Sequence, residues 1–403
     1  MPSTTYSPYS TRYQAVSGLG YDGVVRIRVQ DYYATGVLLN DGRSLLTAAH
    51  LFVDMGDGAF ETEVFFETLT KNKTSVFAES FTIHPDYDDA SATADLAIVH
   101  LKDSAFLDAT RYSIYRKDDI TDLYFTMVGY GTAGTGSTGV ETTSSTPVRR
   151  MADNTIDGDI DLLNNYLSST LAWHSQNSTQ FIADFDNGSY SNDASGRLLN
   201  VSHVGIGAQE GLITPGDSGG PAFIDDKIAG IASYTASLSK DNTHPDIDDI
   251  NNSSYGEIAA WQKLSYYQEW IDEQQRNGYE NAPAEVQDVI KEVDENDAGT
   301  TYVYFLLQFK GTRIDPDQIL SVDYATRDDT AKAGEDYIAI SDTLNLYHGQ
   351  TQAVIAVEII GDNYAESDET FYLDVTNPVG GSFGDDTVML SAIRTILNDD
   401  FIA

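Results

Sequence analysis

Residues 214–221 read Thr214-Pro215-Gly216-Asp217-Ser218-Gly219-Gly220-Pro221 and place one serine among closely spaced glycines. A serine hydroxyl is a weak nucleophile at neutral pH, so it needs a nearby base and fixed hydrogen-bond donors for the oxygen that becomes negatively charged. The glycines permit a tight backbone turn. In such a turn the amide N–H groups of Gly216 and Ser218 converge on one point and form an oxyanion hole. We therefore expect this segment to carry a reactive serine.

Two upstream segments provide the other members of a catalytic triad. The run LLTAAH ends at His50, after an apolar strand-like stretch, and the run ADLAIV carries Asp95 at the start of another. The order His50, Asp95, Ser218 is one of the three chain orders found in convergent serine hydrolases. In this arrangement the histidine takes the serine proton and the aspartate holds the imidazole in the required tautomer.

The motifs TAAH, DLAI and GDSGGP, at residues 47–50, 95–98 and 216–221, resemble those of chymotrypsin-like (trypsin-fold) serine peptidases. The resemblance implies a double β-barrel with the triad in the cleft between the barrels, and no cofactor for catalysis. It also implies further substrate-binding residues, namely an edge strand and the floor of the primary pocket: Ser233, Tyr234, Thr235 and Leu212. A leucine at the floor offers no counter-charge for Lys or Arg, so we expect a preference for apolar or small side chains.

The partner of Asp217 is open at this stage. In the family, activation often frees an N-terminal amine that pairs with the aspartate before the serine. The nearest stretch, Ala15 to Gly20, is only a loose match to the family's new N-terminus. Because a buried carboxylate must be paired, either a cleavage near residues 13–17 releases an amine or another donor serves.

Several further motifs favour structural interpretations. His84, in a segment that resembles the family's HPxY, is interpreted as structural. Residues 129–134 match GxGxxG formally, but no helix pattern follows to receive a pyrophosphate.

The chain between residues 153 and 200 is longer than the family requires. It contains Asp184-Phe185-Asp186-Asn187-Gly188, which resembles the start of a calcium loop but lacks the distant glutamate of an EF-hand, so we favour an Asx-rich turn. Residues 261–273 have helical periodicity and predict the closing helix of the domain.

Composition restricts the classes of partner. The chain has 403 residues, a formal net charge of −40, only 23 Lys plus Arg, and no cysteine. Such acidity argues against nucleic acid as a partner, and no disulfide or thiolate metal site can form. No apolar run approaches the roughly 18 residues of a membrane span, and no signal peptide is visible. Since animal members of the family usually carry disulfides, we expect a bacterial origin. We also expect an acidic, secreted protein that is a monomer.

The last third of the chain differs in character. Residues 279–403 hold 25 Asp plus Glu against 6 Lys plus Arg, and short strand-like segments separated by turn residues recur there. This spacing, without a helix pattern, predicts a β-sandwich. We expect an all-β protein with four regions: an N-terminal extension or propeptide remnant (1–20), the peptidase domain (21–278), a linker (279–286) and the sandwich (287–403).

Carboxylates of this region gather at strand ends, where like charges would repel one another unless hard cations intervene. The segments AGEDY, IIGD, ESDETF and NDD resemble the Calx-β domain of sodium/calcium exchangers and of bacterial extracellular proteins. The resemblance implies an immunoglobulin-like sandwich and calcium ligands at Glu295, Asp336, Asp362, Glu366, Glu369, Asp399 and Asp400. Gly361 stands where some members place another aspartate, which leaves the number of calcium ions open.

We therefore expect a secreted serine endopeptidase that cuts protein or peptide substrates, followed by an accessory calcium-binding sandwich. The alternative is an inactive extracellular protein, in which the first domain recognises peptides without cutting them and the second supports calcium-dependent adhesion.

Overall fold

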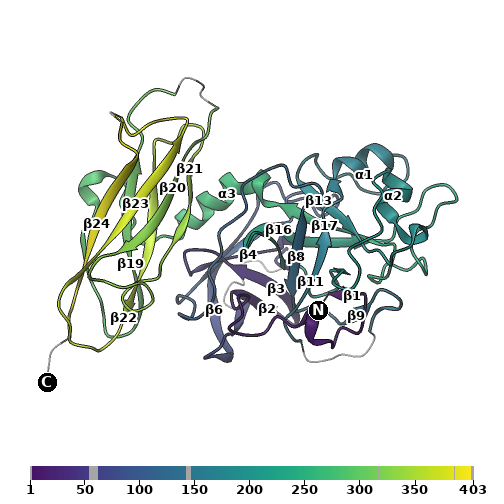
Figure 1. Cartoon of the computed structure of the whole chain (residues 1–403), viewed down its shortest axis with the longest axis horizontal. Helices are drawn as coiled ribbons and strands as arrows, with labels where there is room; N and C mark the ends of the chain where they lie inside the picture. The colour runs from purple at the N-terminus through teal and green to yellow at the C-terminus, as the bar shows by residue number, and fades with distance from the viewer. Residues whose placement is uncertain are drawn as a thin grey trace. The chain divides into compact units, whose positions relative to one another are not determined.

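The structure is a computed structural model that describes residues 2–53, 62–141, 147–313, 315, 317–384 and 386–400. The chain divides into two compact units. The first holds the residues up to Leu39 and from Arg43 to Gln274, and the second holds Asn40–Gly42 and the residues from Gln275 onward. Both units consist mainly of strands, as Figure 1 shows.

Six strands of the first unit close into a barrel, in the order β2-β3-β4-β7-β6-β5. Their bounds are β2 Val24–Val29, β3 Tyr32–Leu38, β4 Ser44–Thr47, β5 Thr62–Glu67, β6 Asn72–Ile83 and β7 Ala97–Leu101. Apolar side chains alternate along β2 and β5 and fill the barrel, where Val25, Ile27 and Phe66 are fully buried. This inward alternation is the pattern that closes a small barrel around side chains.

A seven-stranded sheet follows, in the order β11-β8-β15-β16-β17-β13-β12. Its strands are β8 Tyr124–Gly129, β11 Arg150–Thr155, β12 Gly158–Asp159, β13 Gln180–Asp184, β15 Pro221–Ile224, β16 Lys227–Ala236 and β17 Ile258–Lys263. In its core Phe181 stacks on Trp261, and Phe125 meets Trp261 edge-on. The two sheets together give the barrel and half-barrel arrangement of the double-barrel fold that the motifs predicted.

The closing helix is α3 (Leu264–Asn277), and it begins later than the sequence predicted. Trp261 belongs to β17, where it pairs with Phe181 and Ala232, so the helix prediction from residue 261 was wrong at its start. Strand β17 is buried along its whole length, so its apolar residues do not alternate with polar ones. Periodicity alone therefore could not separate the end of this strand from the first turn of the helix.

The segment assigned to an N-terminal extension is packed into the first unit. Strand β1 (Ser3–Thr4) lies between β9 (Gly134–Thr135) and β14 (Gly211–Leu212). A short 3-10 helix, η1 (Thr11–Tyr13), follows β1, and Tyr13 is buried in the core beside Leu212. The small sheet is completed by β10 (Gly139–Val140).

The excess length between residues 153 and 200 is ordered. It supplies β12 and β13 to the large sheet, and it adds α1 (Asp161–Tyr166), the 3-10 helix η4 (Tyr190–Asn192) and α2 (Ala194–Leu199). These short helices share a core of Leu163, Leu198 and Leu199 with Ile182 of β13. The insertion is therefore part of the folded unit.

The second unit is a two-layer β-sandwich. One sheet has the order β18-β24-β23-β20-β21, and the other pairs β19 with β22. The strands are β18 Glu292–Asp294, β19 Gly299–Gln308, β20 Leu320–Asp328, β21 Ser341–Leu346, β22 Gln352–Gly361, β23 Glu369–Val379 and β24 Met389–Leu397; the 3-10 helix η5 (Val286–Asp288) precedes them. Phe371, Ile359 and Val357 form the centre of its core.

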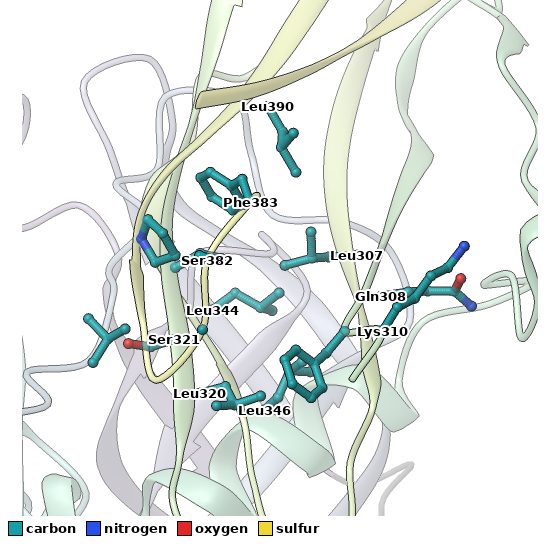
Figure 2. A pocket seen from close by; sticks show the side chains of 15 residues that line it. Leu307, Gln308, Lys310, Leu320, Ser321, Leu344, Leu346, Ser382, Phe383 and Leu390 are labelled. Carbon is teal, nitrogen blue, oxygen red and sulfur yellow. The ribbon is translucent and has the colours of Figure 1, made fainter. Parts of the chain in front are cut away.

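One end of the sandwich is hollow. Apolar side chains of both sheets and of the loop after β23 surround a pocket of about 290 Å³, including Leu307, Leu344, Leu390 and Phe383 (Figure 2). The turns that carry the predicted calcium ligands lie at the opposite ends of these strands.

Of the helices that the structure describes, none is long and apolar enough to cross a membrane.

Candidate active site

His50 and Asp95 form a tight pair. His50 lies in the short 3-10 helix η2 (Ala49–Leu51), directly after β4, and Asp95 precedes β7, the strand paired with β4. The Nδ1 atom of His50 is 2.8 Å from Asp95 Oδ2, and the His50 backbone N–H donates to Asp95 Oδ1 at 2.9 Å. The hydroxyl of Ser233 donates to Asp95 Oδ2 at 2.6 Å. Asp95 therefore fixes the imidazole with both of its oxygens.

The buried carboxylate changes the acidity of the histidine. Burial by itself would lower the pKa of His50, but the hydrogen bond and charge of Asp95 outweigh it and raise the pKa above its usual value. An imidazolium opposite Asp95 is thus stabilised, which is the state that a general base reaches after it accepts a proton.

The loop of Ser218 is held by the first barrel. Thr35, in β3, donates its backbone N–H to the Ser218 carbonyl at 3.0 Å and its hydroxyl to the Gly216 carbonyl at 2.9 Å. Gly219 has a positive φ of 80°, and a Cβ there would lie 2.9 Å from the nitrogen of Ala48, two residues before His50. The serine loop and the histidine turn thus pack directly against each other.

The peptide groups of this loop point in defined directions. Thr132 N–H donates to the Pro215 carbonyl at 2.9 Å, and Gly220 N–H donates to the Asp217 carbonyl at 2.8 Å. In a trans peptide the N–H points away from its carbonyl, so the N–H groups of Gly216 and Ser218 face away from these contacts. Within the described ranges neither N–H has an acceptor. This is the state expected of donors reserved for an oxyanion.

The carboxylate of Asp217 receives hydrogen bonds from other residues of the first unit. Gly131 N–H donates to Oδ1 at 2.7 Å, and both the N–H and the hydroxyl of Thr214 donate to Oδ2 at 3.0 Å. Pro2 lines the same small pocket as Asp217. A Cβ at Gly131 would lie 2.5 Å from the Asp217 carboxylate, so only glycine lets the backbone come this close. Gly131 and Thr214 are thus donors of the second kind that the sequence left open, beside an amine freed near residues 13–17.

The expected substrate-binding residues have different environments. In β16 the segment from Ser233 to Thr235 pairs with β17 on one side, whereas pairing with β15 ends at Ile231. The Tyr234 hydroxyl donates to Gln180, and the Thr235 hydroxyl donates to Asn251. Leu212 is fully buried in the core cluster that also contains Tyr13.

The acidic end of the sandwich gathers most of the predicted calcium ligands. Glu295, Asp336 and Glu366 offer oxygens that all lie within 4.8 Å of one another. Burial and the neighbouring carboxylates Asp362, Glu366, Asp336 and Asp400 raise the pKa of Glu295 to about 7. Burial and Asp336 raise the pKa of Glu369 to about 7. Asp399 is exposed and adjoins the cluster through Asp400.

Gly361 has a physical reason to be glycine. A Cβ at this position would lie 2.5 Å from the Asn296 carbonyl oxygen and 2.8 Å from that of Glu295. An aspartate there would therefore displace the backbone that carries Glu295. The glycine that departs from the Calx-β pattern thus stands where the end of β22 packs closely against the backbone of Glu295 and Asn296.

Sequence reasoning missed the residues that position the catalytic groups. Thr35 and Thr132 act through hydrogen bonds to a loop that is distant in sequence, and no local pattern marks them. The glycines at residues 129 and 131 did form a recognisable motif, but its purpose is close packing against Asp217. His84 was predicted to be structural, and it is buried between Tyr267 and Trp270.

Comparison with known proteins gives two matches along the chain, to the trypsin family over residues 7–253 and to the Calx-beta domain over residues 293–400. Among relatives, the sodium/calcium exchanger Calx of Drosophila melanogaster is 36% identical over 80 residues, which cover 20% of this chain and 8% of the exchanger. Sodium/calcium exchanger 2 of Rattus norvegicus is 38% identical over 92 residues, which cover 20% of this chain and 10% of the exchanger. The chain thus spans about a tenth of the length of these relatives.

Two solved structures are distant neighbours. Neuropsin, a serine protease of mouse brain, matches with a TM-score of 0.46 and 15% identity, over 65% of this chain and 98% of that one. An inactivated protease paralogue of the scabies mite matches with a TM-score of 0.46 and 17% identity, over 64% of this chain and 94% of that one. Since the trypsin match spans well over half of the sequence, the chain belongs to the trypsin family and carries a Calx-beta domain after its peptidase fold.

Proposed function

We propose that this protein is a secreted serine endopeptidase in which His50, Asp95 and Ser218 act as the triad. The observation that carries the proposal is the pair of oriented, acceptor-free N–H groups at Gly216 and Ser218 beside the His50–Asp95 pair. An oxyanion hole that has lost its function would be expected to have a flipped peptide or an N–H bonded within the protein.

The proposed mechanism uses only groups of this chain. His50 accepts the Ser218 proton as the hydroxyl attacks the substrate carbonyl, and the amide N–H groups of Gly216 and Ser218 stabilise the oxyanion. The imidazolium then protonates the leaving amine, and the acyl-enzyme forms. Water, activated by His50, hydrolyses the acyl-enzyme through a second tetrahedral intermediate. Asp95 stabilises the imidazolium in both halves of the cycle.

Peptide substrates have a docking edge in this proposal. The part of β16 beyond Ala232 lacks a strand partner on one side among the described residues, and it begins at Ser233, which contacts Asp95. An extended peptide can add to such an edge through main-chain hydrogen bonds. We place the substrate backbone along Ser233 to Thr235.

The test is hydrolysis of casein and of fluorogenic peptides by wild type and by Ser218→Ala. Loss of one triad member is expected to lower turnover by about 10⁶-fold. Labelling with an organophosphonate at Ser218 separates an activated serine from the alternative, an inactive peptide-binding protein. Peptide hydrolysis that survives in Ser218→Ala would contradict the proposal, as would a wild-type protein that neither cuts nor labels.

For the sandwich we propose calcium binding at its acidic end, through Glu295, Asp336, Asp362, Glu366, Glu369, Asp399 and Asp400. The residues fit the ion because carboxylate oxygens are the ligands that calcium prefers, and because Glu295 is buried among like charges. Calcium would supply the charge that these carboxylates lack. A Glu295→Gln, Asp336→Asn double variant is expected to bind fewer calcium ions per chain in equilibrium dialysis, and an unchanged ion count would contradict the proposal.

A further inference from the structure

The first unit contains a second group of carboxylates, which is almost completely buried. Its members come from the end of β11, the end of β13 and the loop around α2, and each is at most 2% exposed: Asp157, Asp184, Asp186, Asp193 and Glu210. Burial of several like charges is costly unless protons or cations neutralise them. The base that touches them is His203, whose side chain contacts Asp157 and Asp186. One imidazole cannot offset five carboxylates.

Backbone donors hold the cluster in place from several directions. Asp157 accepts the Asp184 N–H at 2.9 Å, Asp184 Oδ2 accepts the Ser195 N–H at 2.7 Å, and Asp193 accepts the Gly196 N–H at 2.5 Å. Glu210 accepts the N–H of Asp186 at 2.6 Å. These bonds fix the carboxylates but leave part of their capacity unused.

Two of these carboxylates keep unused oxygens. Among the described residues, Asp184 Oδ1 and Asp186 Oδ1 are buried and have no hydrogen-bond partner, and Asp186 Oδ2 has only an ion-pair approach of 3.3 Å to His203 Nδ1. Oxygens of Asp184, Asp186 and Asp193 all lie within 4.8 Å of one another. Two ligands of a calcium ion at 2.3–2.6 Å are separated by at most about this distance.

We propose that this cluster is a calcium site, with Asp184, Asp186 and Asp193 as its carboxylate ligands. Hard oxygen donors and no thiolate select calcium over softer metals. A second triplet, Asp157, Asp184 and His203, has the donor types of a zinc site. Calcium at the first triplet is favoured because Asp157 and His203 already bond to each other, whereas the free oxygens belong to Asp184 and Asp186.

The acidities of the cluster agree with this assignment. Burial and the neighbouring charges of Asp157 and Asp186 raise the pKa of Asp184 well above its usual value. Burial raises the pKa of Asp186 to about 6 and that of Glu210 to about 7. A divalent cation stabilises the ionised form of such groups.

The position gives the ion a structural role near the candidate active site. Phe185, between two of the ligands, exchanges backbone hydrogen bonds with Gly256 and Glu257 at the start of β17. Glu210 leads directly into β14 and then into the loop of Ser218. An ion here would therefore stabilise the packing of the insertion (residues 153–200) against the large sheet and near the segment that leads to Ser218. The inference stands whether or not the protein cuts peptides.

The test counts calcium ions bound to the full chain in equilibrium dialysis at about 1 mM free calcium, the range of extracellular modules. Wild type is compared with Asp186→Asn and with Asp226→Asn, a matched control that removes the same charge from an exposed turn. We expect Asp186→Asn to bind one ion fewer per chain than both others. Equal counts in all three proteins would overturn the proposal.

Two further measurements keep the test decisive if Asp186→Asn does not fold. Wild-type crystals soaked in terbium, a substitute for calcium, should show an anomalous peak between Asp184 and Asp186, and its absence would overturn the site. His203→Gln is expected to keep the ion. If His203→Gln loses the ion and wild type takes up zinc instead of calcium at this place, the calcium assignment is wrong.

Discussion

The first unit buries aspartates in two different ways. Near the candidate active site, Asp95 and Asp217 each receive at least three hydrogen bonds from protein groups. In the cluster beside α2, Asp184 and Asp186 keep buried oxygens without a hydrogen-bond partner. Burial of a carboxylate therefore does not, on its own, indicate its role. A carboxylate whose donors all come from the protein orients its neighbours, whereas one with free buried oxygens needs a cation or a proton.

The largest expected effect within this comparison concerns Asp95. Asp95→Asn removes the charge that selects the His50 tautomer, so kcat is expected to fall by about 10⁴-fold with the fold retained. Peptide hydrolysis and thermal unfolding measured on the same samples check this, with Asp226→Asn as control. A variant that keeps more than about a tenth of the wild-type kcat would mean that Asp95 does not act through His50, and the comparison would fail.

The next largest effect is expected from a change at Thr35, whose hydroxyl hydrogen-bonds to the loop of Ser218. Thr35→Val removes the hydroxyl that holds the Gly216 carbonyl and accepts the Tyr130 N–H. If the loop that carries the two oxyanion donors shifts as a result, kcat is expected to fall by roughly 10² while KM changes little, because the oxyanion contact is made in the transition state. Thr82→Val, at a half-buried position in β6, serves as the control. An equal loss in both variants would indicate a general packing effect.

The smallest effect is a shift in a pH profile. The protonated imidazole cannot accept the serine proton, so activity is lost as the pH falls through the pKa of His50. Since Asp95 raises this pKa, the acidic limb of kcat/KM should have its midpoint above the usual value of about 6.5. In His203→Gln the midpoint should not move. A midpoint at or below 6.5 in wild type would show that the Asp95 hydrogen bond does not outweigh burial.

The presence of two proposed calcium sites affects how a chelation experiment is interpreted. Two acidic groups, one at the end of the sandwich and one beside α2, are proposed to bind calcium. Loss of activity in EGTA would therefore not identify the domain involved. The Glu295→Gln, Asp336→Asn double variant and Asp186→Asn remove the two sites separately, and the variant whose activity no longer responds to EGTA identifies the site that supports catalysis.

Some predictions from the sequence succeeded because their signals are local. The GDSGGP run, the strand ends at His50 and Asp95, and the acidic turns between short strands all depend on residues close together in the chain. They predicted the all-β architecture of both units, which the fold confirms, and the pairing of His50 with Asp95. The start of α3 was misjudged because periodicity alone does not separate a buried strand from a helix.

Residue patterns in the sequence were enough to predict the two domain types, the chain order of the candidate triad and the acidic character of the sandwich. The contacts of the folded chain were needed to see that Thr35 holds the serine loop, that Gly131 and Thr214 donate to Asp217, and that Gly361 leaves no room for a side chain. The structure also showed that Asp184 and Asp186, which the sequence indicated as an ordinary acidic turn, belong to a buried cluster. The physical reason is that hydrogen bonding and burial depend on contacts between residues far apart in the chain, which no local spacing encodes.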